Sequence, residues 1–137
     1  MRPMQHIAIL GAGALGAFFA QKFFTWNPAS VSFIAQGERA QRLKTEGLLI
    51  QGVPYLIPVA EPDASPPADL IIVAVKYHDL PHAISALQPY IGPTTLLLSV
   101  MNGLDSEERL AAEYGAEKVL YAIIVGIDAV RDGNCVT

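Results

Sequence analysis

The residues of this chain that could do chemistry begin with three glycines near its N-terminus. Gly11, Gly13 and Gly16 follow the pattern GxGxxG, directly after an apolar run of strand length and at the start of a helix-like segment. Gly11 permits a tight turn, Gly13 lets the backbone approach a pyrophosphate, and Gly16 allows a helix to pack closely on a strand. The amide groups of a helix start also favour an anion. The pattern predicts a dinucleotide site formed by Gly11, Ala12, Gly13, Ala14, Leu15 and Gly16. The alternative is a strand-to-helix turn without a ligand.

The residue type at the end of the second apolar run bears on which dinucleotide is bound. Folds that bind NAD place an acidic residue there, and folds that bind NADP use a cation for the 2′-phosphate. Here the position holds Gln36, which is neither. Arg39 and Arg42 follow at the start of the next helix and could reach a 2′-phosphate, or they could be solvated surface charges. The absence of a carboxylate at Gln36 favours NADP, and NAD is the alternative.

Two polar residues follow later apolar runs. Lys76 comes after "LIIVAV", and Asn102 with Gly103 comes after "TLLLSVM". In an open parallel sheet, ligands bind outside the carboxyl ends of the strands. Lys76 is therefore predicted to contact a ribose or phosphate oxygen, and Asn102 to hydrogen-bond the nicotinamide or a substrate oxygen. The alternatives are a lysine that extends over apolar surface and a conformational Asn-Gly turn.

The histidines and the single cysteine do not form a metal-binding pattern. His6, His78 and His82 lack ligand spacing with a cysteine or a carboxylate cluster, so we predict no metal site. His78 lies two residues beyond Lys76 and is the histidine to consider for proton transfer. Cys135 cannot form an internal disulfide, which predicts a reducing, cytoplasmic setting.

The elements that must position these residues alternate regularly. Five apolar runs have strand length and are continuous, as in parallel strands covered on both faces. They span residues 6–10, 31–35, 70–75, 95–100 and 119–125. Helix-like patterns separate most of them, at residues 14–24, at 38–46, from Leu80 to Ile91, and after Asp105. The alternation predicts an α/β fold of the Rossmann type, with a doubly wound, mostly parallel sheet of five or six strands and helices on both faces.

Local signals refine this plan. Residues 48–59 predict a hairpin turned at Gly52 to Pro54, followed by a proline-rich loop. Gly47 is placed to end the second helix. Asp79 is predicted to cap the third helix, and Asp105 with Glu108 resembles a capping box for the fourth.

Length and composition limit the classes of protein. With 137 residues, of which 52% are hydrophobic and 16% charged, the chain is expected to be one folded domain, residues 1–137. A net charge of −4 gives no electrostatic reason to expect nucleic acid or an anionic membrane as a partner. The glycines, Gln21 and Lys22 interrupt the first apolar segment, which argues against a signal peptide or a membrane span.

Four segments together resemble the N-terminal domain of the ketopantoate reductases, also called 2-dehydropantoate 2-reductases. They are "ILGAGALGAFFA", "VAVKYHD", "MNGLDSEERL" and "RDG", and the resemblance runs over nearly the whole chain. It implies an oxidoreductase that uses NADPH to reduce ketopantoate to pantoate, or a close reductase of 2-oxo acids, in the biosynthesis of pantothenate. It also implies that Gly11 to Gly16 hold the pyrophosphate. Lys76 and Asn102 would contact the ribose and nicotinamide side, and Ala129 would touch the cofactor through its backbone.

The resemblance has two departures. The family usually has an arginine where this chain has Gln36, which leaves NAD open as the cofactor. The family's catalytic lysine, the proton donor, lies in a helical C-terminal domain that we expect outside these 137 residues, so this chain alone is predicted to be inactive. The expected partners are a small 2-oxo-acid substrate and, as a candidate assembly, a second copy in a homodimer. The alternatives are an NAD(H)-sensing module without catalysis and another two-domain dehydrogenase with a different hydroxy acid as substrate.

Overall fold

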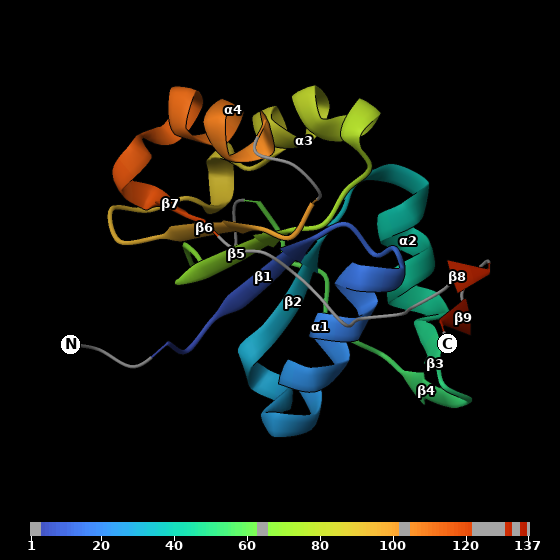
Figure 1. Ribbon diagram of the computed structural model, residues 1–137. Helices are drawn as coiled ribbons and strands as arrows, with labels where there is room; N and C mark the ends of the chain where they lie inside the picture. The colour runs from blue at the N-terminus through green and yellow to red at the C-terminus, as the bar shows by residue number, and fades with distance from the viewer. Residues whose placement is uncertain (1–3, 63–65, 102–104, 122–130, 133–134, 137) are drawn as a thin grey trace.

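A five-stranded parallel sheet forms the centre of the computed structural model (Figure 1). The structure describes residues 4–62, 66–101, 105–121, 131–132 and 135–136. The strands of this sheet lie in the order β2-β1-β5-β6-β7. They are β1 (Ile7–Leu10), β2 (Val31–Ile34), β5 (Leu70–Val73), β6 (Leu96–Ser99) and β7 (Val119–Leu120). The predicted parallel α/β sheet is confirmed.

The apolar runs form these strands because the sheet is covered on both faces. Every residue of β1, β2 and β5 is buried. In the pairing, Ile9 lies beside Phe33 on one side and beside Ile72 on the other. Four of the strands lie within the predicted runs and are one or two residues shorter. The last run is described as a strand only over Val119–Leu120, and its residues 122–125 lie outside the described part of the chain.

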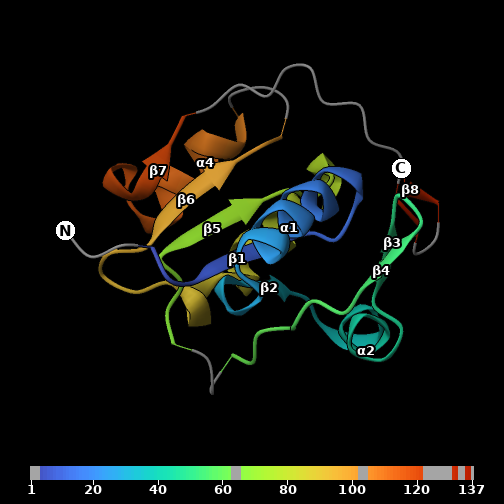
Figure 2. The same cartoon turned by 90° about the horizontal axis from the view of Figure 1, so that it is seen from below.

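The helices lie on both faces of the sheet. Helix α1 (Ala14–Trp26) covers one face, and α3 (Leu80–Ala86) with α4 (Asp105–Tyr114) covers the other (Figures 1 and 2). Helix α2 (Gly37–Thr45) follows β2. Short 3-10 helices are η1 (Pro28–Ser30), η2 (Tyr77–Asp79), η3 (Gln88–Tyr90) and η4 (Ala116–Lys118). Within the ranges that the structure describes, every helix is too short or too polar to span a membrane.

Alternate residues of the central strands belong to two separate cores. Ile72 packs on the α1 side with Ile9 and Phe33, whereas Ile71 packs on the α3 and α4 side with Leu87. Each of these five side chains is at most 1% exposed. The two-residue period of a strand therefore supplies both layers from one continuous apolar run.

The helix boundaries confirm some signals and correct others. The first helix extends to Trp26, two residues beyond its predicted end. Gly47 has a φ of 66° and follows the second helix, as predicted for a C-terminal stop. Asp79 is the N-cap residue of α3, as predicted, but its side chain makes no capping hydrogen bond. Asp105 is the first residue of α4 instead of the residue before it.

The predicted hairpin is part of a second, smaller sheet. Strands β3 (Leu48–Ile50) and β4 (Val53–Tyr55) pair antiparallel, as predicted. The turn consists of Gln51 and Gly52, with φ values of 50° and 77°, so Val53 and Pro54 belong to the strand and not to the turn. Strands β8 (Arg131–Asp132) and β9 (Cys135–Val136) complete the order β4-β3-β9-β8. The sequence patterns predicted the hairpin but not this sheet.

One residue, Val59, pairs with the outer edge of β2 in the large sheet. Val59 forms an isolated parallel bridge with Phe33. Backbone bonds on either side hold it in place, from Phe33 N–H to the Pro58 carbonyl and from Ala60 N–H to the Phe33 carbonyl, each with an N···O distance of 2.8 Å. Counting this position as a third strand gives the order 3-2-1-4-5-6 of dinucleotide-binding sheets.

Candidate functional site

The switch point of the sheet lies between β1 and β5. From β1 the chain moves to β2 on one side, and it later returns to form β5 on the other side of β1. Ligands of doubly wound sheets bind at the carboxyl ends of such strands. The backbone N–H of Ala74 donates to the carbonyl of Leu10 at 2.9 Å, which joins the two segments that leave these strands. The glycine turn and the segment with Lys76 therefore share one edge of the sheet.

Two of the three glycines are required by the packing of the turn. Gly11 has a φ of 104°, and a Cβ there would lie 2.4 Å from the carbonyl oxygen of Ala74. A Cβ on Gly16 would lie 1.9 Å from the carbonyl oxygen of Gly11. Both distances are far below van der Waals contact, so this turn accepts only glycine at these positions. The geometry agrees with the tight turn and the close helix packing predicted for them.

Gly13 differs from its neighbours because a Cβ there would meet nothing within 4 Å. It is the N-cap residue of α1, and no side chain caps this helix start. The first-turn amides of Ala14, Leu15 and Gly16 have no carbonyl four residues earlier inside the helix, and the first turn has no acidic side chain. The open space and the free N–H groups fit a pyrophosphate, which a side chain on Gly13 would displace.

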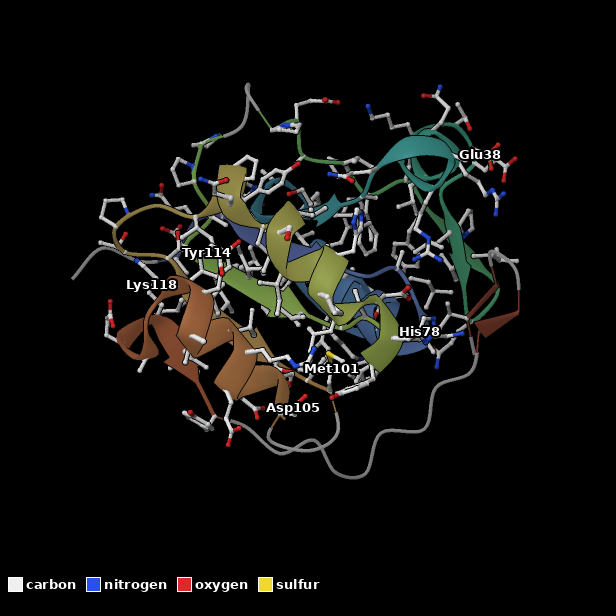
Figure 3. All side chains as sticks on the ribbon, turned by 90° about the horizontal axis from the view of Figure 1, so that it is seen from above. Glu38, His78, Met101, Asp105, Tyr114 and Lys118 are labelled. Carbon is white, nitrogen blue, oxygen red and sulfur yellow. The ribbon has the colours of Figure 1, made fainter. Side chains whose placement is uncertain are left out.

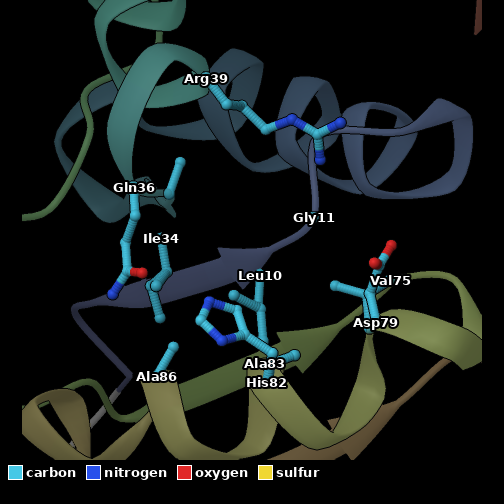
Figure 4. Close-up of a pocket in the computed structure, with 11 residues that line it drawn as sticks. Leu10, Gly11, Ile34, Gln36, Arg39, Val75, Asp79, His82, Ala83 and Ala86 are labelled. Atoms are coloured by element: carbon cyan, nitrogen blue, oxygen red, sulfur yellow. The ribbon is translucent and has the colours of Figure 1, made fainter.

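A pocket of about 310 Å³ lies beside Gly11 (Figure 4). Its walls come from the carboxyl ends of β1 and β2, the start of α2 and one face of α3. The lining residues are Leu10, Gly11, Ile34, Ala35, Gln36, Arg39, Val75, Asp79, His82, Ala83 and Ala86. Apolar walls with a few polar side chains at this size are typical of small-molecule sites.

The two arginines of α2 differ in their position relative to the pocket. Gln36 is the N-cap residue of α2 and, like Arg39 in the first turn, lines the pocket. Arg42 is not one of the lining residues. Figure 4 shows Arg39 on one wall and His82, from α3, on the opposite wall. Of the two cations predicted to reach a 2′-phosphate, the pocket includes Arg39.

The other predicted site residues are placed only in part. Lys76 is exposed and is the N-cap residue of η2, at the carboxyl end of β5 but outside the pocket lining. Asn102 and Ala129 lie outside the described residues. Within the ranges that are described, no group of three His, Cys, Asp or Glu side chains is placed to hold a metal ion.

His78, the histidine considered for proton transfer, lies outside the pocket lining. The His78 side chain is 75% exposed and does not line the pocket, with Nε2 at 3.5 Å from Asp79 Oδ1. His82 lines the pocket instead. A sequence signal for this was present, because Asp79, His82, Ala83 and Ala86 recur at helical spacing and so share one face.

The sheet order and the glycine turn at the switch point define an α/β domain of the Rossmann class. Within this class the chain belongs to the ketopantoate reductase family. The family profile described as "Ketopantoate reductase PanE/ApbA" matches residues 7–137. The resemblance stated from the four sequence segments is confirmed, and the family is one of oxidoreductases.

Named relatives support the family assignment. A 2-dehydropantoate 2-reductase from Aquifex aeolicus is 27% identical over 130 residues, covering 92% of this chain and 41% of that protein. The crystal structure of a 2-dehydropantoate 2-reductase from Geobacter metallireducens matches with a TM-score of 0.77 and 26% identity, covering 96% of this chain and 45% of that one. A D-mandelate dehydrogenase solved with NADH and anilino(oxo)acetate has the same TM-score and identity, covering 96% and 44%. The chain thus spans less than half the length of each.

Proposed function

We propose that this chain, residues 1–137, is the cofactor-binding domain of an NADPH-dependent reductase that acts on 2-dehydropantoate or a closely related 2-oxo acid. The observation that carries the proposal is the uncapped start of α1 at Gly13, where a Cβ would meet open space. Gly13 lies two residues after Gly11, which lines the pocket. The names of the relatives support the substrate. When bound, NADPH would supply the hydride that reduces the keto carbon.

Each part of the site has a proposed role toward this cofactor. The first-turn amides of α1 bind the pyrophosphate, and the pocket beside Gly11 holds the adenosine end. Arg39 binds the 2′-phosphate, and Lys76 contacts the ribose. Asn102 and Ala129 contact the nicotinamide side, as the family resemblance implies. These residues bind and orient the cofactor, because a fixed geometry between reacting atoms accounts for much of an enzymatic rate.

The preference for NADP follows from the charges around the pocket. The end of β2 carries Gln36 in place of a carboxylate, so this position does not repel a 2′-phosphate. Arg39 supplies the cation on the same wall. The carboxylate among the lining residues is Asp79, which comes from the start of α3. NAD is the second candidate, since the similar D-mandelate dehydrogenase was solved with NADH. Similarity to the same dehydrogenase supports, as the second candidate reaction, the reduction of a different 2-oxo acid.

Replacing Arg39 with alanine should weaken NADPH binding by about 10- to 100-fold and NADH binding by less than about threefold. The guanidinium would be removed from a charge-assisted bond to the 2′-phosphate, a group that NADH lacks. Isothermal titration with both nucleotides measures the two affinities. Arg42→Ala is the matched control, because Arg42 lies on the same helix outside the pocket lining. Equal losses for both nucleotides would assign Arg39 no role in selecting NADP.

We also propose that the 137 residues bind the cofactor without turning over substrate, because the family's proton-donor lysine is expected outside them. The purified chain with NADPH and ketopantoate should show no steady-state loss of absorbance at the NADPH band. A full-length ketopantoate reductase in the same assay is the positive control. Steady-state reduction by the chain alone would contradict the proposal.

The assembly and the location are part of the same proposal. We propose a homodimer, in line with the dimeric ketopantoate reductase from Staphylococcus aureus, which has a similar fold at a TM-score of 0.67 and 21% identity. We propose a cytoplasmic location because the sequence has a single cysteine, which cannot form an internal disulfide.

A further inference from the structure

We infer that Tyr77, Asp105 and Arg109 form a clamp that positions Lys76 toward the cofactor. This inference rests on the proposed function, in which Lys76 contacts the cofactor ribose. The three residues come from two elements at the same edge of the sheet, η2 after β5 and α4 after β6. Neither the sequence pattern nor the family resemblance assigns them a role toward the cofactor.

The three side chains contact one another directly. The Tyr77 hydroxyl donates to Oδ2 of Asp105. Arg109 Nε lies 3.0 Å from the same oxygen, and Arg109 Nη2 donates to the Tyr77 hydroxyl at 3.3 Å. The guanidinium also lies over the Tyr77 ring, 5.4 Å from its centroid. Each member therefore contacts both others, so removal of one leaves the remaining pair less well oriented.

The α4 side of the clamp is a fixed support. The hydroxyls of Ser99, the last residue of β6, and Ser106 in α4 are 2.7 Å apart, and both residues are buried. Figure 3 shows Asp105 at the end of α4 nearer to η2, which contains His78. Met101 N–H donates to the Ser99 hydroxyl at 3.3 Å. The start of α4 is thus anchored to the sheet, and the clamp ties η2 to it.

The η2 side contains Lys76. Tyr77 is its immediate neighbour, and the N–H of Asp79 donates to the carbonyl of Lys76 at 2.9 Å. Fixing the Tyr77 ring therefore limits the motion of the Lys76 backbone. Lys76 is exposed and has a long flexible side chain, which must be ordered when the cofactor binds. Because the clamp already holds the Lys76 backbone, less conformational entropy is lost on cofactor binding.

Stability alone does not account for this arrangement. The Asp105 and Arg109 side chains are 48% and 41% exposed, and Tyr77 is 55% exposed. Exposed ion pairs of this kind contribute little to folding. The clamp instead joins segments that lie 28 residues apart in the sequence, at the edge where the cofactor is proposed to bind. This placement favours a positioning role.

The test compares two nucleotides with the 137-residue chain. Tyr77→Phe and Asp105→Asn should each weaken NADPH binding by about three- to tenfold, while binding of 2′,5′-ADP, which lacks the ribose-nicotinamide half, stays unchanged. In a chain that already carries Lys76→Ala, the Tyr77→Phe change should have no further effect on NADPH. A general loss of structure would instead weaken the binding of both NADPH and 2′,5′-ADP. Tyr121→Phe and Glu108→Gln, at exposed positions outside the clamp, are the matched controls.

Titration of the tyrosines tests whether the clamp forms in solution. The hydrogen bond to Asp105 raises the pKa of Tyr77 above its ordinary value near 10, and this outweighs the lowering effect of Arg109. The neutral phenol, and with it the clamp, is therefore present below pH 10 and is lost as the pH rises through the raised pKa. Asp105→Asn should lower the pKa of Tyr77, measured by ultraviolet absorbance as the pH is raised. Tyr114, whose pKa burial raises, should not move.

The outcomes separate the inference from the proposed function. If wild type binds both nucleotides and the Tyr77→Phe variant binds NADPH equally well, the inference is overturned and the proposed function stands. Additive effects of Tyr77→Phe and Lys76→Ala, or an unchanged tyrosine titration in Asp105→Asn, would also overturn it. If the wild-type chain binds neither nucleotide, the proposed function is wrong, and the inference that rests on it is wrong as well.

Discussion

Valine in place of Gly13 should abolish dinucleotide binding and leave the fold of the chain intact. A Cβ at Gly13 meets no atom within 4 Å, and the extended backbone there, with φ −75° and ψ −169°, accepts a β-branched residue. The same open space is where the pyrophosphate is proposed to approach the start of α1. Two methyl groups in that space would block the approach, so we expect a loss of at least about 100-fold in affinity, or about 2.7 kcal/mol.

The measurement pairs nucleotide titration with thermal unfolding. Gly13→Val should unfold within a few degrees of wild type while showing no binding of NADPH at concentrations that saturate wild type. Ala112→Val introduces the same side chain at an exposed position of α4 and should bind NADPH normally. Wild-type affinity in Gly13→Val would remove the start of α1 from the cofactor site.

Alanine in place of Gly16 should have the opposite effect and destabilise the fold itself. The new Cβ would lie 1.9 Å from the carbonyl oxygen of Gly11, which is a backbone atom. The Gly11 backbone has little room to shift, because a Cβ built on Gly11 would lie 2.4 Å from the carbonyl oxygen of Ala74. Alanine gains about 1 kcal/mol of helix propensity over glycine, whereas forced backbone shifts of this size cost about 3 kcal/mol or more. The steric term is larger, so the free energy of unfolding should fall by about 2 kcal/mol or more.

Denaturant unfolding measures this change directly. Gly13→Ala is the matched control, since it makes the same substitution three residues earlier in open space and should change the midpoint little. The midpoint of Gly16→Ala should fall clearly below both wild type and the control. A Gly16→Ala chain as stable as wild type would show that α1 packs less closely on the turn than these distances indicate.

Features set by local chemistry could be predicted from the sequence. The glycine turn was predicted because Gly11 has a left-handed φ of 104° and Gly16 lies against the carbonyl of Gly11, five residues earlier in the chain. The strands were predicted because a sheet buried on both faces requires continuous apolar runs. The helix stop at Gly47 follows from its left-handed backbone, which needs no distant partner.

Features that depend on distant partners could not be predicted in this way. The strand β9 pairs with β3, and no local pattern links Cys135 to Leu49. Asp79 has the residue type of a helix cap, yet it lines the pocket and its side chain makes no capping bond. Asp105 likewise resembled a cap, but its carboxylate accepts a hydrogen bond from Tyr77.

The sequence by itself determined the glycine turn, the parallel strands and the residues at their carboxyl ends, because backbone sterics and side-chain periodicity act between near neighbours. Only the tertiary structure decided which of these residues share a site. Arg39 and Arg42 lie on one helix, but only Arg39 lines the pocket. His82 lines it in place of His78 because α3 turns that face toward β1 and β2. The packing of whole elements sets such pairings, and no single segment carries the information for them.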